Sequence, residues 1–314
     1  MQTTVLLKLK DIYMKIIVLA FMLFNSGFTF AQTNVRVPSI WSFSISNLQG
    51  TYYRALLEEA NKQQTKYNFI AESKPGAGGS IGAAYVGSHE KLALLGTAAG
   101  FFVRPYLYTS SAGYTFDQFV PIHLMTVTPA ALVTGQDKEL DAILKKKHIS
   151  IGTAGTGSLT ELMALKFKES HPGLDIKILP YKSSTEAMQD VLGGHIDLTF
   201  EFLGDAEAKK SKILGVTGRN KIKDYPLLKD IGYLSQADLT GVFFILVKQN
   251  TPVAIQAEIQ LILIEAEKSS RVQELYKSDY STKISSLKPH KDYQIWYAET
   301  IAKFKLLTTG LQVD

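Results

Sequence analysis

The chain has 314 residues, 46% of them hydrophobic and 20% charged, so it can bury a substantial core and general disorder is excluded. Its formal net charge of +5 comes without a long basic run, which argues against nucleic-acid binding. The chain has no cysteine, which excludes disulfides, thiolate nucleophiles and cysteine-ligated metals, and its six histidines show no metal-ligand spacing. At this length a single core usually divides, so we expect two lobes.

The first 31 residues have the features of a secretory signal peptide. Lys15 precedes an apolar stretch at 16–24, and Thr-Phe-Ala stands ahead of Gln32. The apolar stretch is shorter than the ~20 residues that a membrane-spanning helix needs, and an uncleaved anchor is the alternative. Met14, directly before Lys15, is a more natural start than Met1. We therefore expect export through a cleaved signal peptide and a mature protein in the periplasm.

From Val35 onward, short apolar runs alternate with helical patterns, which is typical of an α/β fold with mostly parallel strands. Thr51 is a plausible N-cap for the first helix. The first series comprises predicted strands at 35–45, 67–72 and 92–96 and a helix after the loop at 75–80. The second series comprises predicted strands at 131–134, 149–153, 175–179, 196–200 and 213–217 and helices at 159–169 and 185–192.

Two such series followed by a return segment predict two lobes, each with a mostly parallel sheet flanked by helices. The strand at 241–247 leads into a helix at 253–269. The chain would cross between the lobes twice, with hinges at 128–133 and 241–246. The predicted boundaries are 32–130 and 247–314 for lobe 1 and 131–246 for lobe 2.

The loop PGAGGS at 75–80 follows a strand and precedes a helix, so its glycines can bring backbone N–H groups to an anion at the positive end of that helix. Gly76, Gly78 and Gly82 also give a GxGxxxG spacing that occurs in nucleotide-binding proteins. However, the next strand ends in Leu-Gly-Thr, without the acidic residue that holds a ribose. The loop therefore indicates an anion site or a structural turn, and no cofactor is expected.

The loop AGTGS at 154–158 repeats this design in the second lobe. The hydroxyls of Thr153, Thr156 and Ser158 can donate to a carboxylate beside the backbone amides. The alternative is that they cap the helix that begins at Leu159. Ser158 lacks the GxSxG context of a catalytic serine.

Glu201 stands at the far end of the strand predicted at 196–200, where ligands gather in open α/β sheets. It can accept a hydrogen bond from a ligand amine or hydroxyl, or it is simply solvated. The sequence offers no coherent set of nucleophile, base and orienting partner. We therefore expect no catalytic residues and no metal ligands.

At this point five segments together resemble the substrate-binding receptors of tripartite tricarboxylate transporters, the TctC or Bug family. They are ESKPGAGGSIGA at 72–83, LLGTAAGFFVRPYLY at 94–108, YTFDQFVPIHLMTVTPAALV at 114–133, IGTAGTGSLTELMALKF at 151–167 and LPYKSSTEAMQDVLGGHIDLTFE at 179–201. The resemblance implies a type II periplasmic-binding fold. Its two lobes close on a small organic acid, which is held largely by backbone amides and ordered water.

The resemblance also implies which residues bind the ligand. The first family loop, usually PFxxGGxxD, departs here, because it keeps one glycine, has no Asp and introduces Asn47 and Gln49. In the family's PYKG segment, Ser183 replaces the glycine, and Thr97 would face the cleft. The predicted ligand-binding residues are Asn47, Gln49, Gly50, Thr51, Gly76, Ala77, Gly78, Gly79, Thr97, Ala98, Thr153, Gly155, Thr156, Gly157, Ser158, Tyr181, Ser183 and Glu201.

The predicted function is that of a periplasmic solute-binding receptor. It would capture a small organic acid or related metabolite between its lobes and deliver it to a tripartite membrane transporter, and it would act as a monomer. The alternative is a ligand-sensing periplasmic protein that engages a signalling partner. An enzyme ranks third.

Overall fold

The structure is a computed structural model that describes residues 34–135, 139–232, 239–278, 280–282, 291–311 and 313. The predicted signal peptide at 1–31, with its candidate start Met14, lies outside the described residues. Within the described part of the chain, every helix is too short or too polar to cross a membrane.

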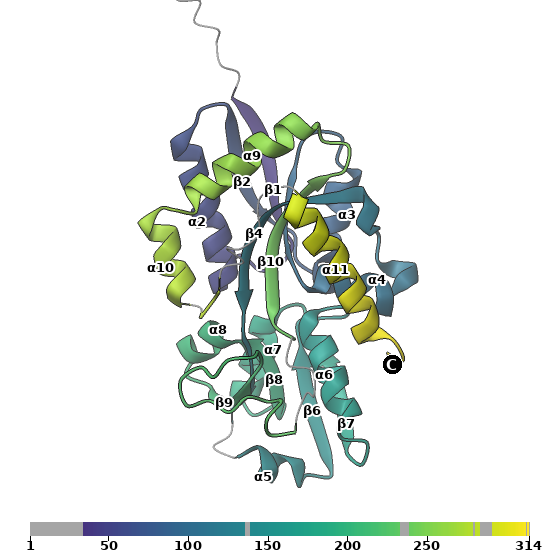
Figure 1. Cartoon of the computed structure of the whole chain (residues 1–314). Coiled ribbons are helices and arrows are strands. Elements are labelled where there is room, and N and C mark those ends of the chain that lie inside the picture. Colours follow the sequence, from purple (N-terminus) through teal and green to yellow (C-terminus); the bar gives the residue numbers. More distant parts are fainter. Residues whose placement is uncertain are drawn as a thin grey trace, which may run out of the picture. The chain divides into compact units, whose positions relative to one another are not determined.

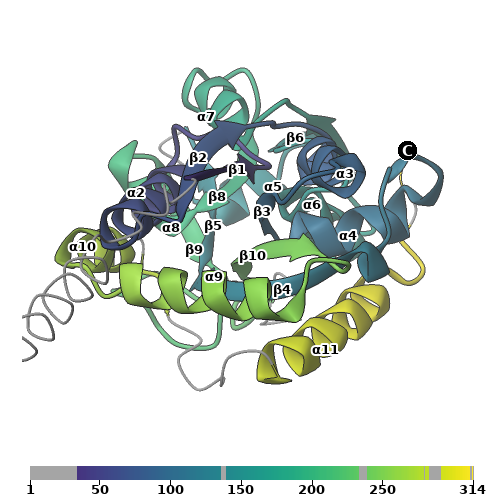
Figure 2. The same ribbon diagram turned by 90° about the horizontal axis from the view of Figure 1, so that it is seen from above.

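The first sheet has five strands in the order β2-β1-β3-β10-β4 (Figure 1). Strand β10 runs antiparallel to both of its neighbours, whereas β1 and β3 are parallel. Its strands are β1 (Val35–Trp41), β2 (Tyr67–Ser73), β3 (Leu94–Ala98), β4 (Phe119–Thr128) and β10 (Gly241–Lys248). The helices that accompany it are α2 (Leu48–Gln63), α3 (Ser80–Ser88), α4 (Gly100–Leu107), α9 (Val253–Ala266), α10 (Ser270–Ser278) and α11 (Lys291–Thr308). Helix α2 packs against α9 and α10, and α11 packs against α4 and β4 (Figure 2).

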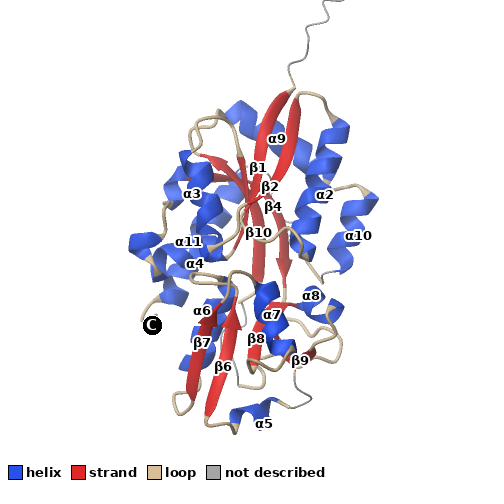
Figure 3. Ribbon diagram, turned by 180° about the vertical axis from the view of Figure 1, so that it is seen from behind, coloured by secondary structure: helices blue, strands red, loops and turns tan. Residues whose placement is uncertain are grey.

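The second sheet also has five strands, in the order β7-β6-β8-β5-β9 (Figure 3). Strand β5 is antiparallel to both neighbours, and β6 is parallel to β7 and β8. Its strands are β5 (Ala130–Thr134), β6 (His148–Thr153), β7 (Asp175–Pro180), β8 (Leu198–Phe202) and β9 (Lys212–Val216). Its helices are α5 (Leu140–Leu144), α6 (Leu159–Glu169), α7 (Ser184–Leu192) and α8 (Leu203–Ala208). The predicted two-lobe α/β fold is confirmed.

Local sequence explains where these elements lie. Every residue of β3 and of β5 is buried, as expected for apolar strands that are covered on both faces. Helix α2 begins earlier than predicted, so the prediction that Thr51 is its N-cap is wrong. The N-cap is Asn47, whose side-chain oxygen accepts the Gly50 N–H at 2.7 Å. The first loop is therefore shorter, and its polar residues belong to a helix end.

The chain passes between the sheets at two places. The first passage is Pro129, which separates β4 from β5. The second ends at Gly241, where β10 begins and pairs with β3 and β4 of the first sheet. The sequence analysis had left 241–246 in lobe 2, but these residues form a buried central strand of the first sheet. At this passage the rings of Phe202 and Phe243 pack edge to face, with centroids 5.1 Å apart.

Candidate functional site

A pocket lies where loops that follow the strands of both sheets meet. It has a volume of about 660 Å³, including the part that is open to solvent. Ligands in open α/β sheets bind at this kind of position, outside the carboxyl ends of the strands. The described lining residues are Phe43, Ser44, Asn47, Pro75, Gly76, Gly78, Gly79, Ala98, Gly100, Ala154, Ser158, Leu159, Thr160, Lys182, Ser183, Ser184, Phe202 and Phe243.

Five helices of at least eight residues begin at this pocket. The lining includes the N-cap residues Asn47 of α2, Gly79 of α3, Ser158 of α6 and Ser183 of α7, and it includes Gly100, the first residue of α4. The N-terminus of a helix carries a partial positive charge and unpaired N–H donors, so it attracts anions. Among the described lining residues Lys182 is the single charged one, and it is exposed. An anion in this pocket would therefore be bound mainly by backbone N–H groups.

The loop before α3 has an unusual backbone. Four consecutive residues, Gly76 to Gly79, have positive φ angles of 120°, 48°, 62° and 99°. The second of them is Ala77, and a non-glycine residue in this region is strained. Helices α3 and α4 have neither a side-chain cap hydrogen bond nor an acidic residue in the first turn. The loop before α3 nevertheless satisfies part of its own donors, because the Gly79 N–H donates to the Gly76 carbonyl oxygen at 3.0 Å and the Ser80 N–H donates to that of Ala77.

The two glycine loops touch each other directly. A Cβ atom added to Gly78 would lie 2.6 Å from the carbonyl carbon of Gly157, and one added to Gly100 would lie 2.6 Å from the Gly78 oxygen. Real Cβ atoms do not approach other atoms this closely, so glycine is required for this contact. The loops at 75–80 and 154–158 thus together form one wall of the pocket. The sequence analysis had predicted them separately, from similar patterns.

The loop at 154–158 uses most of its own donors. The Ser158 hydroxyl accepts the Glu161 N–H at 3.1 Å, and the Glu161 carboxylate accepts the Gly157 N–H at 2.6 Å. The Ala154 N–H donates to the Thr160 hydroxyl at 2.8 Å. The capping interpretation of Ser158 is confirmed. The sequence analysis expected such N–H groups to bind a ligand. Instead they bond within the protein, because the side chains of the Ser-x-x-Glu pattern accept backbone N–H groups at the start of α6.

Arg104 of α4 connects this loop to the first sheet. Its Nη1 donates to the carbonyl oxygen of Thr156 at 2.7 Å and to the hydroxyl at 2.6 Å. The guanidinium also lies over the Tyr108 ring, 4.6 Å from the centroid, and the Tyr108 hydroxyl donates to Glu161 at 2.8 Å. Arg104 is only 7% exposed. The sequence analysis missed this bridge, although one arginine within the apolar helix FFVRPYL is a signal for a buried polar contact.

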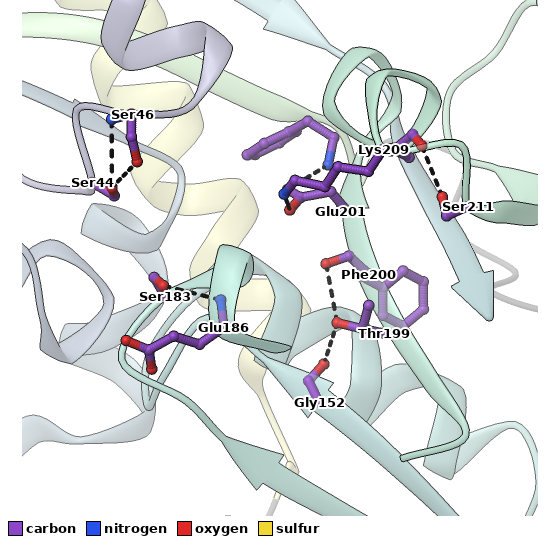
Figure 4. A network of polar contacts seen from close by, with 12 residues as sticks. Ser44, Ser46, Gly152, Ser183, Glu186, Thr199, Phe200, Glu201, Lys209 and Ser211 are labelled. Carbon is purple, nitrogen blue, oxygen red and sulfur yellow. Dashed lines mark hydrogen bonds and ion pairs between the residues drawn. The ribbon is translucent and has the colours of Figure 1, made fainter. Parts of the chain in front are cut away.

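Glu201 lies behind the pocket wall and is 2% exposed, so the alternative that it is simply solvated is wrong. Its carboxylate accepts the Phe202 N–H at 3.0 Å and faces the Lys209 ammonium at 3.4 Å (Figure 4). Burial, and secondarily the repulsion from Asp205, raise the pKa of Glu201 to about 7. Burial also raises the pKa of Asp205, while its hydrogen bond from the Leu48 N–H opposes this shift.

The structure brings seven of the predicted residues into the lining. These are Asn47, Gly76, Gly78, Gly79, Ala98, Ser158 and Ser183. The others lie outside it: Gln49, Gly50, Thr51, Ala77, Thr97, Thr153, Gly155, Thr156, Gly157, Tyr181 and Glu201. Thr97 is fully buried and bonds to the Ser42 hydroxyl at 2.8 Å, and Tyr181 donates to Asp190 at 2.7 Å. In the described part of the chain, no group of three His, Asp or Glu residues could hold a metal ion.

The sequence analysis missed the apolar part of the lining. Phe43, Phe202 and Phe243 come from three different strand ends, and Leu159 begins α6. Phe43, Phe243 and Leu159 were assigned in sequence to predicted strands or a helix, and Phe202 lies just beyond the strand predicted at 196–200. Strand patterns place such residues inside the protein, but they do not show which of them face a pocket.

Two sheets with a pocket between loops at their strand ends define a two-lobed solute-binding protein. The chain belongs to the tripartite tricarboxylate transporter family receptor group, whose family model matches residues 53–299. The resemblance noted in the sequence is thereby confirmed.

A curated relative, the "UPF0065 protein in the TAR-I ttuE-ttuC' intergenic region" of Agrobacterium vitis, is 30% identical over 228 residues. The match covers 67% of this chain and 65% of the relative, so the chain spans just under two thirds of that protein's length. The periplasmic binding protein BugD is similar in structure, with a TM-score of 0.80, 22% identity and coverage of 88% of this chain and 98% of BugD. MatC from Rhodopseudomonas palustris, solved with bound malate, has a TM-score of 0.77, 18% identity and coverage of 87% and 99%. At these identities the two structures establish the fold.

Proposed function

We propose that this protein is a periplasmic receptor that binds a small organic carboxylate in the pocket and delivers it, chemically unchanged, to a tripartite membrane transporter. The observation that carries the proposal is the convergence of five helix N-termini on one pocket. MatC, which is similar in structure, was solved with bound malate, and malate is a small organic carboxylate like the proposed ligand.

Backbone donors alone can supply the affinity that a receptor needs. A hydrogen bond from an N–H group to a charged carboxylate contributes about 1.5 to 3 kcal/mol. Three or four such bonds correspond to roughly micromolar binding, because 1 μM is about 8 kcal/mol. The exposed Lys182 at the rim can add attraction over a longer range.

Isothermal titration with small carboxylic acids and their primary amides tests this proposal. We expect measurable binding of at least one acid and none of its amide, because the amide keeps the shape and loses the negative charge. If acids and amides bind equally, or no acid binds at all, carboxylate recognition is refuted. Mass spectrometry of the recovered ligand then tests for chemical change.

Delivery to a transporter is tested separately. Crosslinking in native membranes should join the ligand-loaded receptor to integral subunits of a transporter. Recovery of a signalling protein instead would overturn the delivery step and leave carboxylate binding intact.

A further inference from the structure

The short helix α8 of the second lobe carries two acidic residues that contact the first lobe. In Figure 1, α8 lies just below α2 and α10. Asp205 of α8 accepts a hydrogen bond from the N–H of Leu48, the first residue of α2. Glu207 of α8 accepts one from the hydroxyl of Tyr280, which follows α10, at 2.6 Å. One helix of the second lobe therefore holds the first lobe at two points.

The contact of Glu207 lies at the hinge between the lobes. The Glu207 carboxylate also pairs with the Lys223 ammonium of its own lobe at 2.8 Å. Close to Tyr280 in the chain, Thr282 forms an antiparallel bridge with Val127 near the end of β4. The chain passes to the second sheet two residues after Val127. A contact at this position changes little when the lobes rotate, so it can act as a pivot.

The contact of Asp205 lies beside the pocket. Its partner Leu48 follows Asn47, which lines the pocket and whose side chain accepts the Gly50 N–H. Helix α2 has no acidic residue of its own in the first turn. Asp205 supplies this negative charge from the other lobe, at a helix end that attracts it. Because the two partners belong to different lobes, this contact breaks when the lobes move apart.

Asp205 is buried next to a second carboxylate. It is only 7% exposed, and its Oδ2 atom has no hydrogen-bond partner among the described residues. Glu201 repels it, and the Lys209 ammonium of α8 attracts both carboxylates. Glu201 also accepts hydrogen bonds from the Phe202 N–H and from the Ser184 hydroxyl of α7. Two buried negative charges that share one cation are unfavourable, so a closed molecule with one of them protonated is more stable.

From this arrangement we propose that Asp205 is a positioning residue for ligand binding, which holds the lobes closed by capping α2 while α8 pivots at the contact between Glu207 and Tyr280. The inference rests on the proposed function only in that a receptor has to open and close. Burial in the closed form raises the pKa of Asp205, and raises the pKa of Glu201 to about 7. The closed form therefore holds a proton that the open form has released, and closure weakens as pH rises from 6 to 8.

Single-molecule energy transfer measures this movement, because the chain has no cysteine and can be labelled at two introduced ones. Arg54→Cys on α2 and Gln189→Cys on α7 are exposed positions, one in each lobe. We expect an open and a closed population, with roughly threefold more closed molecules at pH 6 than at pH 8. Asp205→Ala should lower the ratio of closed to open molecules about tenfold and flatten its dependence on pH. A single population at both pH values, or the same ratio in parent and variant, would overturn the inference.

Two further variants complete the test. Asp224→Ala, an exposed aspartate of the same lobe, is the matched control and should behave like the parent. Asp205→Asn keeps an acceptor for the Leu48 N–H and removes the charge, so it should retain part of the closure with a weaker dependence on pH, and it replaces Asp205→Ala if that variant does not fold.

Titration with malate separates this inference from the proposed function. If the parent binds malate, Asp205→Ala should bind it about tenfold more weakly, because less of the protein is closed. Equal malate affinity in parent and variant would overturn the inference and leave the proposed function standing. If the parent binds no malate, this result counts against the proposed function alone, and the two label populations still decide the role of Asp205.

Discussion

The two glycine-containing loops of the pocket have similar sequences and different chemistry. The loop at 75–80 adopts four positive φ angles and leads into a helix without a side-chain cap. The loop at 154–158 leads into a helix whose cap, Ser158, and first-turn acid, Glu161, bond to the loop itself. Small residues between a strand and a helix thus allow two outcomes, and the residues that follow decide between them. On one side of the pocket no side chain caps the helices α3 and α4, and on the other side serine side chains cap α6 and α7.

The largest effect is expected from Gly78→Ala, which would break the contact between the loops. An alanine at φ +62° is strained by about 1 to 2 kcal/mol, and its Cβ would lie 2.6 Å from Gly157. Ligand affinity should fall roughly ten- to a hundredfold, since the loops can no longer close together. Calorimetric titration measures this.

Gly173→Ala is the control for that variant, because no atom lies within 4 Å of the added Cβ. It should bind like the parent protein. If Gly78→Ala also binds like the parent, the loops do not have to touch for the ligand to be held.

A smaller loss is expected from Arg104→Ala, which removes the bridge to Thr156. A hydrogen bond from a charged group contributes about 1.5 kcal/mol or more, so affinity should fall about tenfold, and the melting temperature should fall as well because Arg104 is buried. Arg104→Lys should restore part of the affinity.

The exposed Arg54 provides the matched control, as Arg54→Ala. Should Arg104→Ala stay within twofold of the parent in affinity, the bridge would have no part in closing the pocket.

The smallest effect concerns Glu201 and Asp205, the two buried acidic residues near the second sheet. The raised pKa of Glu201, about 7, means that the folded protein holds a proton which the unfolded chain has released above its ordinary carboxyl pKa of 4.5. The free energy of unfolding should therefore decrease as pH rises from about 4.5 to 7. Glu201→Gln removes this titration. Between pH 5 and pH 8 the free energy of unfolding of the variant should therefore rise by on the order of 1 kcal/mol relative to that of the parent protein.

Urea unfolding of both proteins at the two pH values measures this difference. Parallel behaviour of parent and variant would show that Glu201 titrates normally. Because Glu201 and Asp205 are neighbours, the observed transition belongs to the pair.

Much of the fold could be predicted because its strands are apolar runs and its helices are bounded by local signals. The helix predicted at 159–169 agrees with α6, Leu159–Glu169, since Ser158 and Glu161 mark its start. The start of α2 was misplaced because two possible caps, Asn47 and Thr51, stand four residues apart. The boundary at which the chain re-enters the first sheet was predicted after residue 246, whereas β10 begins at Gly241, because an apolar run does not reveal which sheet it joins.

The pocket was only partly predictable. The glycines of the loop at 75–80 could be assigned, since strand–loop–helix units place such loops at the carboxyl edge of a sheet. The role of Thr156 could not, because its partner Arg104 is 52 residues away in sequence. The Ser-x-x-Glu pattern at Ser158 and Glu161 was a visible sign that this loop would bond to itself.

The most direct test is a crystal structure of the protein with a small carboxylic acid that binds in the calorimetric titrations. The account predicts carboxylate oxygens within hydrogen-bonding distance of backbone N–H groups at the helix N-termini that line the pocket. A carboxylate bound outside this pocket, or a pocket that remains empty at saturating ligand, would contradict it.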